Sequence, residues 1–100
     1  MLGGIHGFDW DEGNRDKCRK HGVAIETIET LFRDSRLMVQ PDVANSKSET
    51  RYKAVGRAAE GRSIFVVFTL RDRDGRRLIR PISARYMHKK EIIAFEKENP

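Results

Sequence analysis

The chain contains arginines and hydroxyl residues of the kinds that bind and cleave a phosphodiester. Cleavage of a phosphodiester without a metal ion requires a base near the attacking hydroxyl, cations at the phosphate and a proton for the leaving oxygen. Arg71, with Arg51 and Thr69 beside it, could hold one phosphate through its forked N–H donors, and Arg85 could grip another. The further side chains expected to contact RNA are Lys20, Lys53, Ser83 and Tyr86.

The side chains available for proton transfer are His21, Glu49, Tyr52 and Tyr86. An imidazole titrates near neutrality, whereas a tyrosine or a carboxylate generally needs a shifted pKa to exchange protons there. The sequence does not choose among the four. His21 also suits the end of a helix, where the macrodipole favours a cation. Glu49 also suits an ion pair with a nearby cation, and Tyr52 suits the core.

The histidines and the cysteine show no pattern of a metal site. His6, His21 and His88 lack metal-ligand spacing, so we predict no metal and no cofactor. Cys18 is the only cysteine, which excludes an internal disulfide and fits a reducing compartment. Without a partner base, Cys18 is expected to be a buried small residue rather than a nucleophile.

Length and charge limit the class of protein. One hundred residues suffice for a single domain, which we expect to span 1–100. Residues 1–50 contain 7 Lys and Arg against 9 Asp and Glu, whereas residues 51–100 contain 13 against 6. The excess of positive charge therefore lies in the second half and favours an acidic partner such as nucleic acid. We find neither an apolar run of about 20 residues nor signal-peptide features, and expect a cytoplasmic protein without membrane contact.

Hydrophobic periodicity predicts an α+β chain with a mostly antiparallel sheet of four to five strands. His6, Phe8 and Trp10 share one side of a first strand expected at 5–10, and Phe8 and Trp10 are expected to be packing anchors rather than platforms for bases. A helix capped by Asp11 and ended by Gly22 follows. A second helix presents an apolar stripe of Ile25, Ile28, Leu31 and Phe32. Further strands are expected at 37–40, 51–57, 63–71 and 77–84, and a last helix at 87–98.

The expected turns assign residues to the two faces of the sheet. Turns centred on residues 60 and 74 place Thr69 opposite Arg51 and Ile79, and Lys53 opposite Val67. The even-numbered face is then apolar and is covered by the second helix, whereas the odd-numbered face is cationic, open and suited to a polyanion. The expected apolar positions are Tyr52, Ala54, Ile64, Val66, Phe68, Leu70, Leu78 and Ile82.

Two residues of the last strand do not suit this register. Arg80 falls on the apolar face, which does not suit a cation. Pro81 cannot donate a hydrogen bond within a ladder of strands. We therefore expect a bulge or an edge position near Pro81.

Four sequence blocks resemble the BrnT-type toxins of bacterial type II toxin–antitoxin systems, over about 90 residues. In order they are Phe8-x-Trp10-Asp11, Lys20-His21-Gly22-Val23, Val66-Val67-Phe68-Thr69-x-Arg71 and Ile82-Ser83-Ala84-Arg85. The chain departs from the pattern at Asn14, where a lysine is expected, and at Cys18, where an asparagine is expected. A docking role is the favoured interpretation of both positions.

The resemblance implies a RelE-like fold with two N-terminal helices on one face of the sheet and a C-terminal helix. It also implies an RNA endonuclease that halts translation, and a BrnA-like antitoxin that wraps the toxin and represses its own operon. Two toxins with two antitoxins are implied, with operator DNA contacted only through the antitoxin.

Two alternatives to an RNA-cleaving toxin remain at this point. In the first, the chain is a non-enzymatic nucleic-acid-binding module whose cations only hold phosphates, and Arg71 has no transition state to stabilise. In the second, it is a pure interaction subunit. For Arg71 itself, the alternative to a functional role is a solvated ion pair with Asp72 or Asp74 at the end of the strand.

Overall fold

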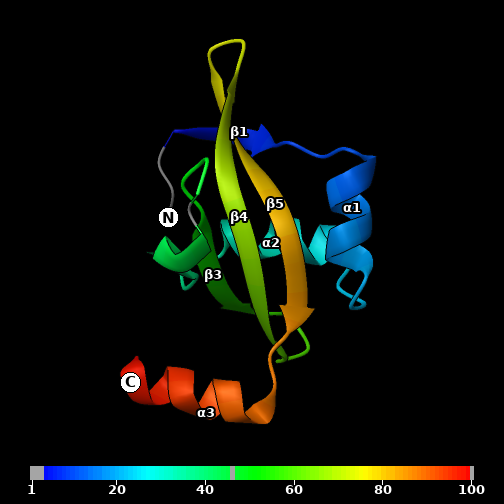
Figure 1. Cartoon of the computed structure of the whole chain (residues 1–100). Helices are drawn as coiled ribbons and strands as arrows, with labels where there is room; N and C mark the ends of the chain where they lie inside the picture. Colours follow the sequence, from blue (N-terminus) through cyan, green and yellow to red (C-terminus); the bar gives the residue numbers. More distant parts are fainter. Residues whose placement is uncertain (1–3, 46, 100) are drawn as a thin grey trace.

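Five strands form one mixed sheet in the order β1-β5-β4-β3-β2, flanked by helices (Figure 1). The structure is a computed structural model that describes residues 4–45 and 47–99. Its elements are β1 (Ile5–Phe8), α1 (Glu12–Arg19), α2 (Ile25–Arg33), β2 (Met38–Pro41), the 3-10 helix η1 (Val43–Asn45), β3 (Tyr52–Arg57), β4 (Ser63–Arg73), β5 (Arg76–Tyr86) and α3 (Lys89–Glu98). The predicted α+β class is confirmed.

Strand β1 is shorter than predicted and lies parallel to β5 at one edge of the sheet. Phe8 and Trp10 pack against the core, so their interpretation as packing anchors is confirmed. The prediction that His6 shares their side is wrong. The pairing of β1 with β5 is irregular at its start, and His6 is exposed, with its Nδ1 accepting the N–H of Arg77.

Helix α1 begins at the predicted cap and is fastened to β5 by Asn14. The Asp11 side chain accepts the N–H of Asn14 at 3.0 Å, and the Asn14 side chain accepts the N–H of Asp11 at 2.7 Å. The amide of the buried Asn14 also donates to the carbonyls of Asp9 at 3.0 Å and Pro81 at 2.8 Å. Cys18 is fully buried in the core. Both departures from the family pattern therefore have docking roles, as predicted.

Helix α2 covers the apolar face of the sheet, as its stripe predicts. Ile28, Leu31 and Phe32 are buried there, and the Phe32 ring lies edge-on to Phe68, with 4.9 Å between ring centroids. Leu31 approaches the backbone of Gly56, where an added Cβ would lie 2.8 Å from its Cδ2 atom. The absence of a side chain at Gly56 thus lets α2 pack closely on β3.

Strand β4 is central, as predicted, with β3 on one side and β5 on the other. The β3–β4 ladder has the predicted register, because Lys53 lies opposite Val67. The ladder begins one residue after Arg51, whose predicted partner is Thr69.

The β4–β5 register differs from the prediction by one residue. Leu70, not Thr69, lies opposite Ile79. The cause is the turn, which consists of Asp74 and Gly75 with φ values of 53° and 74°. A two-residue hairpin turn of this kind requires positive φ at both positions, and its centre falls between residues rather than on residue 74.

This shift reverses the faces of the first half of β5. Ile79 and Pro81 are buried with the core strands, and Arg80 lies opposite Thr69 on the other face. Leu78 lies opposite Arg71 on that open face as well. The predictions for Leu78, Ile79 and Arg80 are therefore wrong.

A β-bulge, predicted near Pro81, restores the expected faces in the second half of β5. Pro81 pairs with Phe68 and Ser83 with Val67, so Ile82 is the extra residue between them. The prediction of Ile82 as a regular apolar-face position is wrong for this reason. After the bulge, Ser83 and Arg85 lie on the open face, as predicted.

Strand β2 forms the other edge of the sheet and includes Pro41, one residue beyond the predicted end of the strand at residue 40. Pro41 lies opposite Tyr52, and an edge strand tolerates a residue that lacks an N–H. Within residues 4–45 and 47–99, no helix has the length and apolar character needed to cross a membrane.

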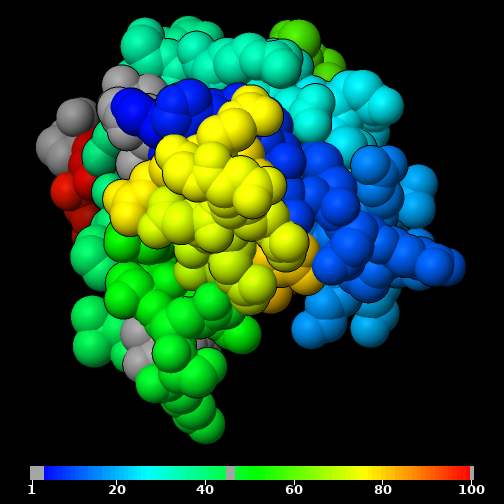
Figure 2. Space-filling model, turned by 90° about the horizontal axis from the view of Figure 1, so that it is seen from above, coloured from blue at the N-terminus to red at the C-terminus, as the bar shows by residue number. Residues whose placement is uncertain are grey.

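The two ends of the β4–β5 hairpin have different neighbours. Its tip projects beyond the rest of the sheet and lies against β1 (Figures 1 and 2). At the opposite end, α3 lies beneath the sheet (Figure 1). None of residues 89–98 is buried, so α3 is the most weakly packed of the described helices.

Candidate functional site

An open depression of about 500 Å³ lies where β5 ends, and several side chains suited to RNA chemistry line it. The turn after α1 supplies His21, the β3–β4 turn supplies Arg62, the end of β5 supplies Arg85 and Tyr86, and the start of α3 supplies His88. Both imidazoles are exposed. The depression therefore combines two groups that can exchange protons with two guanidiniums that can bind a phosphate.

Arg85 is held in the depression by the first turn of α3. Its two terminal nitrogens donate to the two carboxylate oxygens of Glu91, each at 2.7 Å. The backbone N–H of His88 donates to the same carboxylate at 2.9 Å. Hydrogen bonds from Arg85, followed by the one from His88, lower the pKa of Glu91 to about 2. These contacts leave the other N–H donors of the Arg85 guanidinium available to a substrate.

Arg62 is held by an aromatic ring. Its Cζ atom lies 3.5 Å from the centroid of the Tyr86 ring. Arg85 has a similar but longer contact with Phe65, at 5.0 Å from Cζ to the ring centroid. Such cation–π contacts fix the direction of a guanidinium without neutralising its charge.

The other predicted site residues gather elsewhere on the open face. Arg71 pairs with Glu49 at 3.3 Å, and the buried Thr69 donates its hydroxyl to the carbonyl of Thr50 at 2.7 Å. Lys53 lies 3.7 Å from Asp42. Arg51 precedes β3 beside this group.

This second group is distant from the depression. Leu78, the partner of Arg71 in the ladder, is separated from Arg85 by seven positions that include one bulge. At ~3.3 Å per residue, Arg71 and Arg85 are roughly 20 Å apart. The structure thus brings His21, Arg85 and Tyr86 together and separates them from Arg71 and its partner Glu49, with Arg51 beside that pair. Thr69 and Lys53 lie at intermediate positions, because Lys53 is opposite Val67, the partner of Ser83.

Carboxylates balance much of the positive charge toward the hairpin tip. Asp9 lies 3.2 Å from Arg73 and 3.5 Å from Arg80, and Asp11 accepts a 2.8 Å hydrogen bond from Arg80. These ion pairs connect β1 and the start of α1 to the hairpin. The open face is consequently less cationic at this end than the sequence alone predicts.

The remaining predicted residues have simple environments. Lys20 is exposed next to His21, and Ser83 is half-buried on the open face. Tyr52 stacks on Phe68 with 5.3 Å between ring centroids, which confirms its expected place in the core. Within the described ranges, no three side chains of His, Cys, Asp or Glu are grouped so that they could hold a metal ion.

Arg62 and His88 line the depression but were not predicted as site residues. The hairpin pattern carried a signal for Arg62, because the turn before β4 must lie beside the end of β5. His88 follows the last family block by three residues, and its approach to His21 depends on how α1 packs. That packing has no local signature in the sequence.

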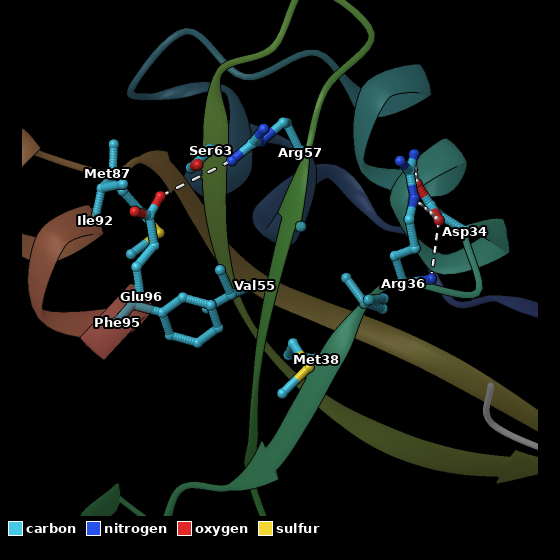
Figure 3. A pocket seen from close by; sticks show the side chains of 12 residues that line it. Asp34, Arg36, Met38, Val55, Arg57, Ser63, Met87, Ile92, Phe95 and Glu96 are labelled. Atoms are coloured by element: carbon cyan, nitrogen blue, oxygen red, sulfur yellow. Dashed lines mark hydrogen bonds and ion pairs between the residues drawn. The ribbon is translucent and has the colours of Figure 1, made fainter. Parts of the chain in front are cut away.

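A second cavity, of about 280 Å³, lies between α3 and the β2–β3 edge of the sheet (Figure 3). Val55, Phe95 and Met38 provide much of its apolar lining. Arg57 and Glu96 approach to 4.0 Å at its rim. Met87 lines both this cavity and the depression, so the two are neighbours.

Comparison with known families gives a match that covers most of the chain. A family model described as the ribonuclease toxin BrnT of type II toxin–antitoxin systems matches residues 10–91. No curated protein matches the chain. The matched region includes His21, Arg62, Arg85, His88 and Glu91. The chain therefore belongs to the BrnT family of ribonuclease toxins, which act in type II toxin–antitoxin systems and have an antitoxin as partner.

Proposed function

We propose that this chain is an endoribonuclease that inhibits translation by cutting RNA without a metal ion, and that the reaction takes place in the depression. The observation that carries the proposal is the convergence of His21, His88, Arg62 and Arg85 on one open cavity. The family supplies the general activity, and these side chains supply the groups that metal-free cleavage needs.

In the proposed reaction, the 2′ oxygen of RNA attacks the adjacent phosphorus while one imidazole removes its proton. The bond from phosphorus to the 5′ oxygen breaks, and the other imidazole protonates that oxygen. The products are a 2′,3′-cyclic phosphate and a 5′-hydroxyl. Arg62 and Arg85 stabilise the negative charge that builds on the phosphate, and Tyr86 fixes the position of Arg62.

The cations outside the depression hold RNA in this proposal. Lys20 is placed to contact a phosphate next to the cut. Arg71, with Arg51, contacts phosphates several nucleotides away, and Lys53 and Ser83 contact the chain between them and the depression. Thr69 does not take the predicted RNA-binding role, because it is buried and its hydroxyl bonds to the carbonyl of Thr50. Glu49 keeps Arg71 in position through their 3.3 Å ion pair rather than acting as the base.

Cleavage of a labelled single-stranded RNA by the purified chain in excess EDTA tests the proposal. We expect cleavage without added metal, with cyclic phosphate and 5′-hydroxyl ends. His21→Asn and His88→Asn should each lower kcat by about 10²- to 10⁴-fold, the usual contribution of a general acid or base.

His6→Asn is the matched control for the histidine variants. His6 lies beside Arg77 at the opposite end of β5, so its replacement should leave kcat unchanged. Cleavage that requires a divalent metal, or full activity of both His21→Asn and His88→Asn, would refute the proposal.

We also infer that the partner is a BrnA-like antitoxin, with two copies of each chain per complex and operator DNA contacted only through the antitoxin. Family membership and the net charge of +5 support an acidic protein partner. An RNA substrate and a reduced Cys18 suit the cytoplasm. The mass of the co-expressed complex in solution tests the stoichiometry, and a mass other than that of two copies of each chain would contradict it.

A further inference from the structure

Arg62 differs from the other arginine of the depression in its partner. Arg85 forms an ion pair with Glu91, whereas no carboxylate of residues 4–45 and 47–99 pairs with Arg62. One side of the Arg62 guanidinium rests against the Tyr86 ring, and the residue is exposed. A flat cationic surface, supported from below by a ring, therefore borders the depression.

Backbone contacts hold this Arg62–Tyr86 pair in place. The carbonyl of Arg62 accepts the N–H of Ala58 at 2.9 Å, which closes the β3–β4 turn. The carbonyl of Ser63, the next residue, accepts the N–H of Met87 at 3.0 Å. Tyr86 itself lies opposite Ile64 at the end of the β4–β5 ladder. Both halves of the pair thus extend from a fixed backbone and need little reorganisation to bind a ligand.

We propose that the Arg62–Tyr86 pair is a stacking platform for one unpaired nucleobase next to the scissile phosphate. The inference rests on the proposed function, because it takes RNA to be the substrate of the depression. Arg62 then has two tasks: its charge attracts the phosphate, and its outer face orients the adjoining base.

The chemistry of nucleic acids explains why the base must be unpaired. Proteins commonly stack single-stranded RNA bases on aromatic rings or on guanidinium planes. In a duplex, each base is already stacked on its neighbours and cannot reach such a platform. The pair therefore selects unpaired RNA and accepts every base type, because each has a π face.

Arg62→Lys tests the platform, because it keeps the positive charge and removes the flat surface. The substrates are one RNA and a series of the same RNA with a single abasic nucleotide at each position near the cut. We expect Arg62→Lys to lower kcat/KM on the intact RNA about tenfold. An abasic nucleotide at the stacked position should lower the wild-type value similarly, and Arg62→Lys should add no further loss there.

One arginine variant and two Tyr86 variants serve as controls. Arg36→Lys changes another exposed arginine, which lies outside the depression, and it should leave kcat/KM unchanged. Tyr86→Phe keeps the ring and should keep the dependence on the base, whereas Tyr86→Leu should remove it. If Arg62→Lys has no effect, or lowers cleavage of the intact RNA and every abasic RNA by the same factor, the platform is refuted.

A binding measurement separates this inference from the proposed function. A 2′-O-methyl oligonucleotide cannot be cleaved, and 2-aminopurine within it loses fluorescence on stacking. We expect quenching at one position with the wild-type chain and with Arg36→Lys, and none with Arg62→Lys. Quenching without cleavage of any RNA would leave the platform intact and refute only the proposed activity. Quenching at no position would refute the platform.

Discussion

The carboxylate of Glu91 and the guanidinium of Arg85 form two parallel hydrogen bonds of 2.7 Å that tie the first turn of α3 to the end of β5. None of residues 89–98 is buried, so this ion pair is a principal polar attachment of α3. It also fixes the orientation of the Arg85 guanidinium in the depression. The position of α3 and the arrangement of the candidate site are therefore coupled through one carboxylate.

This coupling predicts that acid detaches α3. The pKa of Glu91 is lowered from 4.5 to about 2, chiefly by Arg85. A carboxylate with a lowered pKa in the folded chain stabilises it above the unfolded pKa and loses that effect as the pH falls through the folded value. Amide protection in residues 89–98 should therefore decrease between pH 4.5 and about 2, before protection in β4. Glu91→Gln is the control and should show low protection already at pH 7. Full protection of wild-type α3 at pH 2 would contradict the prediction.

Asn14→Ala should destabilise the chain without touching the candidate site. The substitution leaves the carbonyl of Pro81 without its donor in a buried place and removes the Asn14 side chain's half of the capping box of α1. Losing a buried hydrogen bond of this kind costs about 1–3 kcal/mol in the free energy of unfolding. Urea denaturation measures the loss, and Asn99→Ala, at an exposed helix end, should cost much less. Equal costs for the two variants would contradict the role assigned to Asn14.

Cys18 should be inert in the folded chain. Burial raises the pKa of its thiol to about 11, and the side chain has no exposed surface. A thiol-specific reagent at pH 7 should modify it only after unfolding by urea, since the thiolate is the reactive form. Reaction at the same rate in the folded and unfolded chains would show that the core is open at α1.

Arg71→Ala and Arg85→Ala should have different effects on cleavage if the chemistry takes place in the depression. Arg71→Ala should weaken RNA binding and reduce, by about one, the magnitude of the slope of the logarithm of the RNA-binding constant against the logarithm of the salt concentration. Its kcat should stay within about threefold of the wild-type value. Arg85→Ala should lower kcat by about 10²-fold, because it removes charge stabilisation at the phosphate. A larger loss of kcat for Arg71→Ala would place the reaction at the Glu49–Arg71 group instead.

Local signals in the sequence were sufficient for most of the fold. The cap at Asp11, the stripe on α2 and the central position of β4 all follow from patterns within a few residues. The faces to which β5 side chains point do not follow from such patterns. A one-residue error at the Asp74–Gly75 turn assigns every β5 residue before the bulge to the wrong face. The sequence predicts a bulge near Pro81 but does not specify Ile82 as its extra residue.

The candidate site was predictable residue by residue but not as a group. The family blocks single out His21 and Arg85, and the wealth of arginines predicts phosphate contacts. Nothing in the sequence shows which arginines are matched by carboxylates, because Asp9 and Arg73 are 64 positions apart and meet only through β1 and β5. Arg62 becomes a candidate only once the structure shows that, within residues 4–45 and 47–99, no carboxylate pairs with it.

The bulge at Ile82 has a consequence for how this family varies. Odd-numbered residues of β5 face inward before it and even-numbered residues face inward after it, so one strand delivers Pro81 to the interior and Arg85 to the depression. A relative that lacks this single residue can keep the same order of apolar and cationic positions, because Pro81 would then precede Ser83 in a regular ladder with the faces unchanged. Keeping Ile82 but pairing it regularly with Val67 would instead drive a guanidinium inward and bring Ala84 to the surface.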